Sequence, residues 1–202
     1  MLEREREEIS HKYFKLFKPY GVISQFSSND KRQLRKKKFL KDLESLPEDL
    51  MPVGRLDEKS EGLLLLTTDG VFSDTVNRSG IEKEYLVLVD GAIDNSSIEK
   101  LKQGISIGLH GEKYITKPCF VEILTTPPNL PDRGKKIRDA RHGPVTWIRV
   151  IIKEGKFRQI RKMTSAVGYP TLRLVRVRVG AVGIDNMIPE QLLPIEKTLV
   201  FN

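Results

Sequence analysis

The sequence predicts an α+β fold with a mixed, largely antiparallel sheet flanked by helices, and three observations support this. Short apolar runs recur along the chain, and most are closed by Gly, Pro or Asp, which is typical of strands joined by turns. Segments with helical periodicity stand among them without a regular strand–helix–strand alternation, so a parallel sheet is not favoured. The 202 residues, 39% of them hydrophobic, suffice for a substantial core in one domain or two small halves.

The sequence of the first half of the chain predicts a charged N-terminal segment, called the lead here, followed by two strands and a helix. Residues 1–10 are charged and contain no apolar signal core, so we expect a lead that is neither a secretory nor a transit peptide. Residues 13–21 alternate apolar with basic residues and break at a proline and a glycine, as a strand that ends in a turn does. The four leucines at residues 63–66 predict a buried strand. Asp69–Gly70 predicts a turn, and residues 71–80 a short helix.

The second half predicts further strands and helices around one long loop. We expect a helix over residues 94–105, capped by Asn95, Ser96 or Ser97. Residues 125–144 contain proline, glycine and charge but no apolar periodicity, which indicates an exposed loop. Strands are predicted at residues 83–91, 114–124, 145–155 and 171–180.

Basic residues are concentrated in two segments. Residues 31–41 hold seven Lys or Arg and no acid, which fits either a solvated surface or contacts to phosphates. From Arg133 to Arg178 the chain has fourteen Lys or Arg against two acids, a density that indicates a basic surface patch. Together with the net charge of +8, this distribution favours a polyanionic partner.

A helix is predicted over residues 155–168, inside the second basic segment. Arg158 and Lys162 are expected to point away from its apolar stripe, and Arg161 to lie at the border of the stripe. A guanidinium in that position is partly desolvated and needs a carboxylate partner. The stripe itself consists of Phe157, Ile160, Met163 and Val167.

The strand that follows shows a shift in its apolar pattern. Leu172 and Leu174 share one face, whereas the valines from Val175 onward continue on the other, which predicts a β-bulge at Leu174–Val175. The arginines of this strand are then expected to project toward solvent or ligand; they are Arg173, Arg176 and Arg178.

The sequence lacks the motifs of several chemistries. Neither common glycine-rich phosphate loop is present, nor a nucleophile elbow, which argues against a nucleotide cofactor. His11, His110 and His142 are too scattered for a zinc site, and the single Cys119 is expected in the core. We therefore expect no cofactor and no metal. No apolar run approaches the ~20 residues of a membrane span, so we expect a cytoplasmic protein without membrane contact.

Two residues remain ambiguous on local grounds. Asp57 lies between Gly54 and Gly62, just before the leucine strand, and a rigid strand could hold a reactive side chain in place there. The local sequence nevertheless favours a turn-stabilising aspartate or a structural ion pair. Tyr85, as a single aromatic on a strand, is expected first in the core, and it would need to point into a cleft to serve as a platform for a nucleobase; the local sequence does not decide between the two.

Three long segments resemble the main motifs of the RsuA-type pseudouridine synthases, the branch of that superfamily that modifies ribosomal RNA. The resemblance extends from about Phe14 to about Ile184, in the order of the family. It implies a pseudouridine synthase fold with a central RNA-binding cleft, and a uridine isomerase that needs neither cofactor nor metal. The matching segments are GRLDEKSEGLLLLTTDG, KEYLVLVDG and EGKFRQIRKMTSAVGYPTLRLVRVRVGAV.

The resemblance also implies roles for single residues. Asp57 matches the catalytic aspartate, Tyr85 the tyrosine that stacks on the target base, and Arg161 the basic residue paired with the aspartate. Arg55 matches an arginine associated with the flipped-out nucleotide, and Lys162 stands where the family commonly has arginine. The expected RNA-binding residues are Arg55, Arg158, Lys162, Arg173 and Arg176.

Many family members carry an N-terminal S4 RNA-binding domain, which we do not expect here, because the catalytic domain is predicted over residues 11–202. Residues 137–147 resemble the short members that act on large-subunit ribosomal RNA. We therefore expect large-subunit ribosomal RNA as the partner. We also expect the enzyme to be a monomer. Two alternatives remain: the same activity on small-subunit ribosomal RNA, or a catalytically silent ribosomal RNA-binding or assembly factor. The presence of Asp57, Tyr85 and Arg161 together favours an enzyme.

Overall fold

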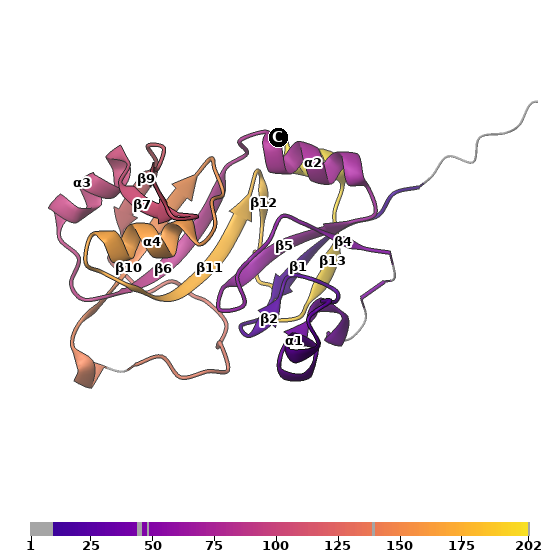
Figure 1. The fold of residues 1–202 in the computed structure, drawn as a ribbon, viewed down its shortest axis with the longest axis horizontal. Coiled ribbons are helices and arrows are strands. Elements are labelled where there is room, and N and C mark those ends of the chain that lie inside the picture. Colours follow the sequence, from indigo (N-terminus) through magenta and orange to yellow (C-terminus); the bar gives the residue numbers. More distant parts are fainter. Residues whose placement is uncertain (1–9, 44–45, 48, 139, 202) are drawn as a thin grey trace, which may run out of the picture.

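The computed structural model describes residues 10–43, 46–47, 49–138 and 140–201 (Figure 1). Apart from Ser10, the charged lead predicted for residues 1–10 lies outside this part of the chain. The described residues form one large sheet and two small ones. The large sheet has the order β13-β1-β5-β11-β6-β10-β9, with β4 added to β5 and β12 to β11.

Each strand of the large sheet occupies a short segment of the chain. The bounds are β1 Tyr13–Lys18, β4 Met51–Val53, β5 Glu61–Thr67, β6 Lys83–Asp90, β9 Phe120–Ile123, β10 Val145–Ile152, β11 Thr171–Val179, β12 Val182–Gly183 and β13 Leu192–Pro194. The small sheets pair β2 (Val22–Ile23) with β3 (Lys38–Phe39), and β7 (Ser106–Leu109) with β8 (Glu112–Ile115).

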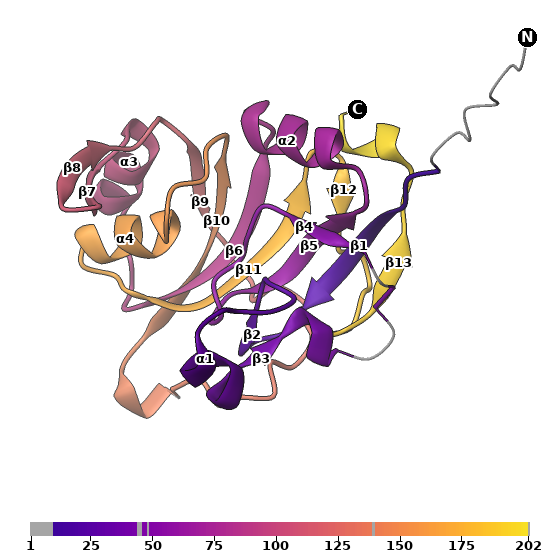
Figure 2. The same ribbon diagram turned by 45° about the vertical axis from the view of Figure 1, so that its right-hand side comes forward.

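Two halves of the large sheet meet at a short parallel contact. Within each half the described strands pair antiparallel, whereas β5 and β11 pair parallel at Val175–Glu61 and Arg176–Gly62. Figure 2 shows this junction in the middle of the molecule, with β1 and β13 on one side and β10 and β9 on the other. The predicted α+β fold with a largely antiparallel sheet is confirmed.

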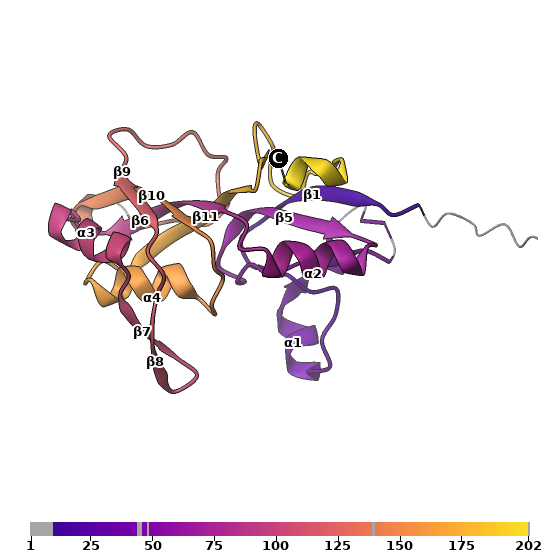
Figure 3. The same ribbon diagram turned by 90° about the horizontal axis from the view of Figure 1, so that it is seen from above.

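In the described part of the chain, four α-helices and the small strands β7 and β8 surround the sheet. Figure 3 shows α1 (Lys31–Lys36), α4 (Gln159–Ala166) and the β7–β8 hairpin projecting to one side, while the long loop before β10 lies on the other. The remaining α-helices are α2 (Gly70–Arg78) and α3 (Asn95–Gln103). Single 3-10 turns occur at Leu40–Asp42, Ala140–His142 and Lys197–Val200.

The leucine strand is the best-buried element of the sheet, as predicted. All seven residues of β5 are buried, because the strand is covered on both faces. Leu64 and Leu66 pack into one core with Leu16, whereas Leu63 and Leu65 pack into the other with Phe17. Burying a leucine contributes about 1.5–3 kcal/mol, so β5 is a stiff support for the loop that precedes it.

Three sequence predictions for the elements are wrong in detail. Residues 114–124 are not one strand, because Pro118 has no amide hydrogen to continue a ladder, and β8 and β9 form on either side of it. The residue that caps α3 is Asp94, whose side chain accepts the Ser97 amide at 2.7 Å. Asp69 likewise caps α2 directly, rather than forming a separate turn.

The predicted β-bulge is also misplaced. Leu174 and Val175 pair in continuous register with Val87 and Leu86, and the register shifts lie before and after them, at Thr171/Arg173 and Arg176/Arg178. The two apolar residues are adjacent because β11 is covered on both faces: Leu174 packs into one core and Val175 into the other. Adjacent apolar residues therefore mark a central strand here.

In the part of the chain that the structure describes, no helix has the length and apolar character needed to cross a membrane.

Candidate active site

The loop of residues 54–60, between β4 and β5, carries Asp57. Hydrogen bonds to the backbone of Leu56, Asp57 and Glu58 hold this loop in place. Ser24 Oγ donates to Leu56 O at 2.9 Å and accepts from Leu56 N at 3.1 Å, so one serine holds both backbone groups. Asp57 O accepts the amide of Ser60 at 3.0 Å, which closes a turn behind the carboxylate. Glu58 O accepts the Gly21 amide at 2.8 Å.

Glycine is required where this loop enters β5. Gly62 has φ +97°, a region that L side chains rarely adopt. A Cβ atom there would lie 2.2 Å from Arg176 O, so the parallel contact between β5 and β11 requires the missing side chain. The close approach of the two strands brings Arg176 next to the loop of Asp57.

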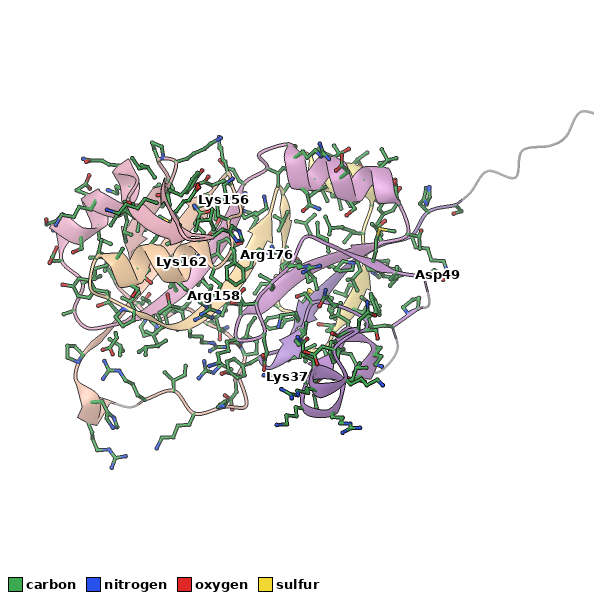
Figure 4. All side chains as sticks on the ribbon, in the orientation of Figure 1. Lys37, Asp49, Lys156, Arg158, Lys162 and Arg176 are labelled. Atoms are coloured by element: carbon green, nitrogen blue, oxygen red, sulfur yellow. The ribbon has the colours of Figure 1, made fainter. Side chains whose placement is uncertain are left out.

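A pocket of about 270 Å³ opens at the junction of the two halves. Sixteen described residues line it, and Asp57 is the one carboxylate among them. Figure 4 shows Lys156, Arg158 and Arg176 near one another at this junction. The positive side chains of the lining are Arg55, Lys83, Lys156, Arg158 and Arg176.

Two arginines from the start of α4 face the Asp57 carboxylate. Arg158 Nη1 lies 3.5 Å and Arg161 Nε 3.6 Å from Asp57 Oδ2. These separations are those of ion pairs rather than of good hydrogen bonds. The structure thus brings Arg161 to Asp57, and it adds Arg158, which the sequence pattern had pointed away from the helix face. Both arginines therefore place positive charge beside the Asp57 carboxylate.

Arg161 also holds the backbone of the loop that carries Asp57. Its Nη2 donates to Lys59 O at 2.7 Å and to Ser60 Oγ at 3.1 Å. The arginine side chain is 12% exposed. Burial lowers the pKa of Arg161 from its usual value, and the Asp57 carboxylate opposes this change. One guanidinium therefore contacts both the Asp57 carboxylate and the backbone of the loop that carries it.

The turn before α4 is built by a second carboxylate. Glu154 accepts from Tyr114 Oη at 2.6 Å, from Lys117 N at 2.9 Å and from Gln159 Nε2 at 2.6 Å. Arg158 follows in the left-handed region, at φ +53°, which is costly for a residue with a Cβ. Strain of this kind persists only where surrounding contacts impose it, and here it aims Arg158 at Asp57.

Phe157 does not belong to the apolar stripe of the helix. The helix begins at Gln159, after the left-handed Arg158, so Phe157 lies in the preceding turn and is 60% exposed. Ile160 and Met163 are buried as predicted. The prediction fails for Phe157 because the periodicity was extended across a residue whose backbone is not helical.

Tyr85 and Arg176 both line the pocket and pair with each other across β6 and β11. Tyr85 is 8% exposed and also packs into a hydrophobic core, so both of its expected positions, core and pocket wall, apply at once. Arg176 is 4% exposed. Its Nε donates to Leu63 O at 2.7 Å, and its buried Nη2 has no hydrogen-bond partner among the described residues.

The expectation that the arginines of β11 all project toward solvent or ligand is wrong for Arg173, whereas Arg176 lines the pocket. Arg173 is 7% exposed and forms a bidentate pair with the buried Glu61, with distances of 2.9 and 3.1 Å. Its Nη2 also donates to Pro131 O at 2.7 Å, in the long loop of residues 125–144. Arg178 pairs with Glu82 and Glu84. The partners come from distant segments, which the strand pattern alone does not reveal.

A second, shallower hollow of about 480 Å³ lies between α4 and β7. Arg158, Arg161 and Lys162 line it, and its eight lining residues, all described, include no carboxylate. Lys162 Nζ donates to Gly108 O at 2.7 Å. Because Arg158 lines both cavities, the hollow adjoins the pocket of Asp57.

The basic run at residues 31–41 lies beside the loop of residues 54–60 that carries Asp57. Helix α1 has no buried residue, and Lys37 Nζ donates to both carboxylate oxygens of Glu58, at 2.8 and 2.9 Å. Figure 4 shows Lys37 on the α1 side of the junction. Both interpretations of this run, solvated surface and phosphate contact, are compatible with its exposure.

Sequence reasoning missed a buried cation beneath the site. Lys18 Nζ is fully buried and donates to Pro19 O at 2.8 Å and Val22 O at 2.7 Å. Burial lowers the pKa of Lys18 to about 7, although nearby carboxylates, first Glu61 and then Asp57, oppose this. No local signal in the sequence marks the end of β1 as covered.

The comparisons with known proteins agree on one family. The family model described as RNA pseudouridylate synthase matches residues 12–166. A ribosomal large subunit pseudouridine synthase E of Xanthomonas axonopodis pv. citri is 40% identical over 176 residues, covering 86% of this chain and 88% of the relative. A ribosomal small subunit pseudouridine synthase A of Escherichia coli is 30% identical over 187 residues, covering 91% of this chain and 70% of the relative.

A solved structure gives the same result for the fold. A crystal structure described as a pseudouridylate synthase superposes with a TM-score of 0.74 at 26% identity, covering 95% of this chain and 73% of that chain. This likeness confirms the fold expected from the three resembling segments. The chain therefore belongs to the RNA pseudouridylate synthase family.

Proposed function

We propose that this protein converts a specific uridine of large-subunit ribosomal RNA to pseudouridine, with Asp57 as the catalytic residue. The observation that carries the proposal is a single carboxylate in the pocket lining: Asp57 lies beside Tyr85 and Arg158 in the lining and is also paired with Arg161. A protein that only bound RNA would need the cations, but it would not need a carboxylate held at the centre of them.

Binding comes before chemistry, because the sugar of a stacked nucleotide is out of reach. Removing the target base from its stack costs a few kcal/mol. Tyr85 is proposed to recover part of this cost as a stacking platform, since one base–aromatic contact is worth about 1–3 kcal/mol. Arg55, exposed at the rim of the pocket, is proposed to hold the flipped-out nucleotide.

The proposed reaction moves one glycosidic bond. The N1–C1′ bond breaks with its electron pair left on the uracil, the base rotates, and a C5–C1′ bond forms; the C5 proton then leaves to a base and N1 takes up a proton. Asp57 either attacks C1′ or promotes the cleavage in another way. In both routes the Asp57 carboxylate acts next to the sugar, and the flanking Arg158 and Arg161 are proposed to hold it in position.

Two cations that line the pocket, Arg176 and Lys83, are proposed to receive the negative or acceptor groups of the nucleotide. Arg176 Nη2 is buried and has no acceptor among the described residues, so a uracil carbonyl or a phosphate oxygen would satisfy it. Burial lowers the pKa of Lys83, and the neighbouring Arg176 lowers it further. An anion between these two cations would relieve their mutual repulsion. Arg173 is proposed to affect RNA binding indirectly, because its guanidinium is already paired with the Glu61 carboxylate.

Large-subunit ribosomal RNA is favoured as the substrate over small-subunit ribosomal RNA because the relatives named for the large subunit are more similar in sequence to this chain. Relatives named for the large subunit are 37–41% identical to this chain, whereas those named for the small subunit are 30–32% identical. The small-subunit RNA is therefore the alternative substrate for the same chemistry.

Pseudouridine mapping tests the proposal. Both ribosomal RNAs would be sequenced for pseudouridine from cells with the gene, without it, and with it restored. We expect a large-subunit site to disappear without the gene and to return with it. A loss confined to small-subunit RNA would replace the substrate, and an unchanged map in both RNAs would overturn the proposed activity.

A further inference from the structure

Phe157 is an aromatic residue in a position that packing does not explain. It stands in the turn before α4 and is 60% exposed, although burial of a phenylalanine is worth about 1.5–3 kcal/mol. Its sequence neighbours Lys156 and Arg158 both line the pocket of Asp57. The exposed ring therefore stands at the rim of the site rather than on a remote surface.

Two other elements hold the Phe157 ring in place. The His110 ring, in the turn of the β7–β8 hairpin, stacks beside it with a centroid separation of 6.5 Å and an interplanar angle of 29°. Lys162 Nζ lies 5.1 Å from the Phe157 centroid and is itself tied to Gly108 O. A ring that is ordered by an imidazole and an ammonium but still exposed is suited to stack a further planar group.

The hollow next to this ring is suited to an anion. Arg158, Arg161 and Lys162 line its approximately 480 Å³, and the eight lining residues, all within the described chain, include no carboxylate. Lys162 belongs both to the hollow and to the contact with Phe157. A phosphate site and an aromatic platform thus share one residue, and the hollow shares Arg158 with the pocket of Asp57.

We propose that the hollow and the Phe157–His110 pair form a second nucleotide subsite, which binds a nucleotide next to the target uridine in the RNA. Its phosphate lies against Arg158 and Lys162, and its base stacks on Phe157. The ligand is single-stranded RNA, because a paired base does not offer its face to a protein ring. This inference rests on the proposed function, and it adds a determinant of where along the RNA the enzyme stops.

Phe157→Ala is the test, with Phe120→Ala as the matched control. Phe120 is also exposed, at 43%, and a cation, Arg149, also lies over its ring, but it stands on the edge strand β9. Affinity would be measured for an oligouridylate and for the ribosomal RNA fragment that carries the mapped uridine. We expect Phe157→Ala to weaken binding of both RNAs about 5- to 150-fold, the loss of one stacked base, Phe157→Trp to retain it, and Phe120→Ala to match the wild type.

Abasic nucleotides locate the subsite. With the wild type, an abasic replacement at one position next to the target should weaken binding, and with Phe157→Ala the same replacement should have no further effect. Unchanged affinity of Phe157→Ala, or equal losses in both phenylalanine variants, would overturn the inference. Binding of polyglutamate, a probe for an acidic protein, would be measured with the same variants. If Phe157→Ala lost polyglutamate binding but kept RNA binding, the hollow would be assigned to an acidic protein and the inference would be overturned.

These outcomes are separable from the fate of the proposed function. If no RNA is modified but Phe157→Ala still weakens binding at one nucleotide, the subsite stands and the proposed activity fails. If the RNA is modified but Phe157→Ala binds it like the wild type, the activity stands and the subsite fails.

Discussion

Arg161 Nε lies 3.6 Å from Asp57 Oδ2, while Nη2 of the same guanidinium donates to Lys59 O and Ser60 Oγ. One side chain of α4 thus joins the two halves of the sheet at the point where the pocket opens. The contact depends on a planar group with several donors, because the carboxylate, the carbonyl and the hydroxyl lie in different directions.

Arg161→Met should lower the rate of pseudouridine formation by about 10²-fold at saturating RNA, because the loop of Asp57 loses its anchor and a small misplacement of a reacting group has an effect of that size. Arg161→Lys should give an intermediate rate, since an ammonium keeps the charge but cannot serve all three acceptors. Single-turnover measurements would check both. Arg78→Met is the control, because Arg78 pairs with Asp74 on the exposed surface of α2; a wild-type rate for Arg161→Met would contradict the positioning role.

Tyr85→Phe should preserve RNA affinity, because the ring and its packing remain, and should lower the rate if the hydroxyl takes part in proton transfer. Binding assays and single-turnover rates on the same RNA would separate the two effects. Full activity in Tyr85→Phe would leave the hydroxyl without a role in proton transfer. Tyr85→Ala should also destabilise the fold by about 3–5 kcal/mol, because the residue is 8% exposed in the core.

Arg173→Met should destabilise the protein by about 3–5 kcal/mol, because it leaves the Glu61 carboxylate buried without a partner. The double variant Glu61→Gln with Arg173→Met should be clearly more stable than the sum of the single losses. Urea unfolding would measure both. Lys102→Met breaks the exposed pair with Glu99 and should cost less than about 1 kcal/mol; a similarly small loss for Arg173→Met would show that the buried pair contributes nothing special.

Asp69 gives the protein a pH-dependent contribution to stability. Its pKa lies well below the usual range, first because the Phe72 amide and then because the Lys197 ammonium stabilises the carboxylate. The folded protein binds fewer protons than the unfolded chain, so this contribution is complete above the ordinary carboxyl pKa and is lost as the pH falls through the folded pKa.

Asp69→Ala should therefore cost about 1 kcal/mol near pH 7, a value typical of helix caps, and less below about pH 4, where the unfolded carboxyl becomes protonated. Urea unfolding of both proteins between pH 7 and pH 3.5 would measure the difference. A difference that stayed constant over this range would exclude the charged cap as its source.

The parts of the fold that follow from local pattern were predictable. The leucine run of β5, the loop of Asp57 before it and the buried face of α4 each rest on a few neighbouring residues, and Arg161 was expected beside a carboxylate from its position at the border of the helix stripe. These features need only the period of a strand or helix and the cost of burying a charge.

The remainder depends on which segments meet. Arg173 appeared to face outward because its partner Glu61 lies in another strand, and the burial of Lys18 was missed because nothing nearby marks the end of β1 as covered. The apparent bulge in β11 came from burial on both faces, and Phe157 left the predicted helix because Arg158 is left-handed. The error at Arg173 concerns a contact across the junction of the two halves, which no local periodicity encodes, whereas the error at Phe157 concerns the backbone of a single residue.

Asp57→Asn is the most direct test of the proposed catalysis, since it keeps the size of the side chain and removes its charge. Pseudouridine formation would be measured on the ribosomal RNA fragment, together with RNA affinity and urea unfolding. The adjacent Glu58→Gln serves as control, because Glu58 pairs with Lys37 rather than with the arginines of α4. We predict no pseudouridine from folded, RNA-binding Asp57→Asn and normal activity from Glu58→Gln; pseudouridine formation by Asp57→Asn at a rate close to that of the wild type would contradict the assignment of Asp57.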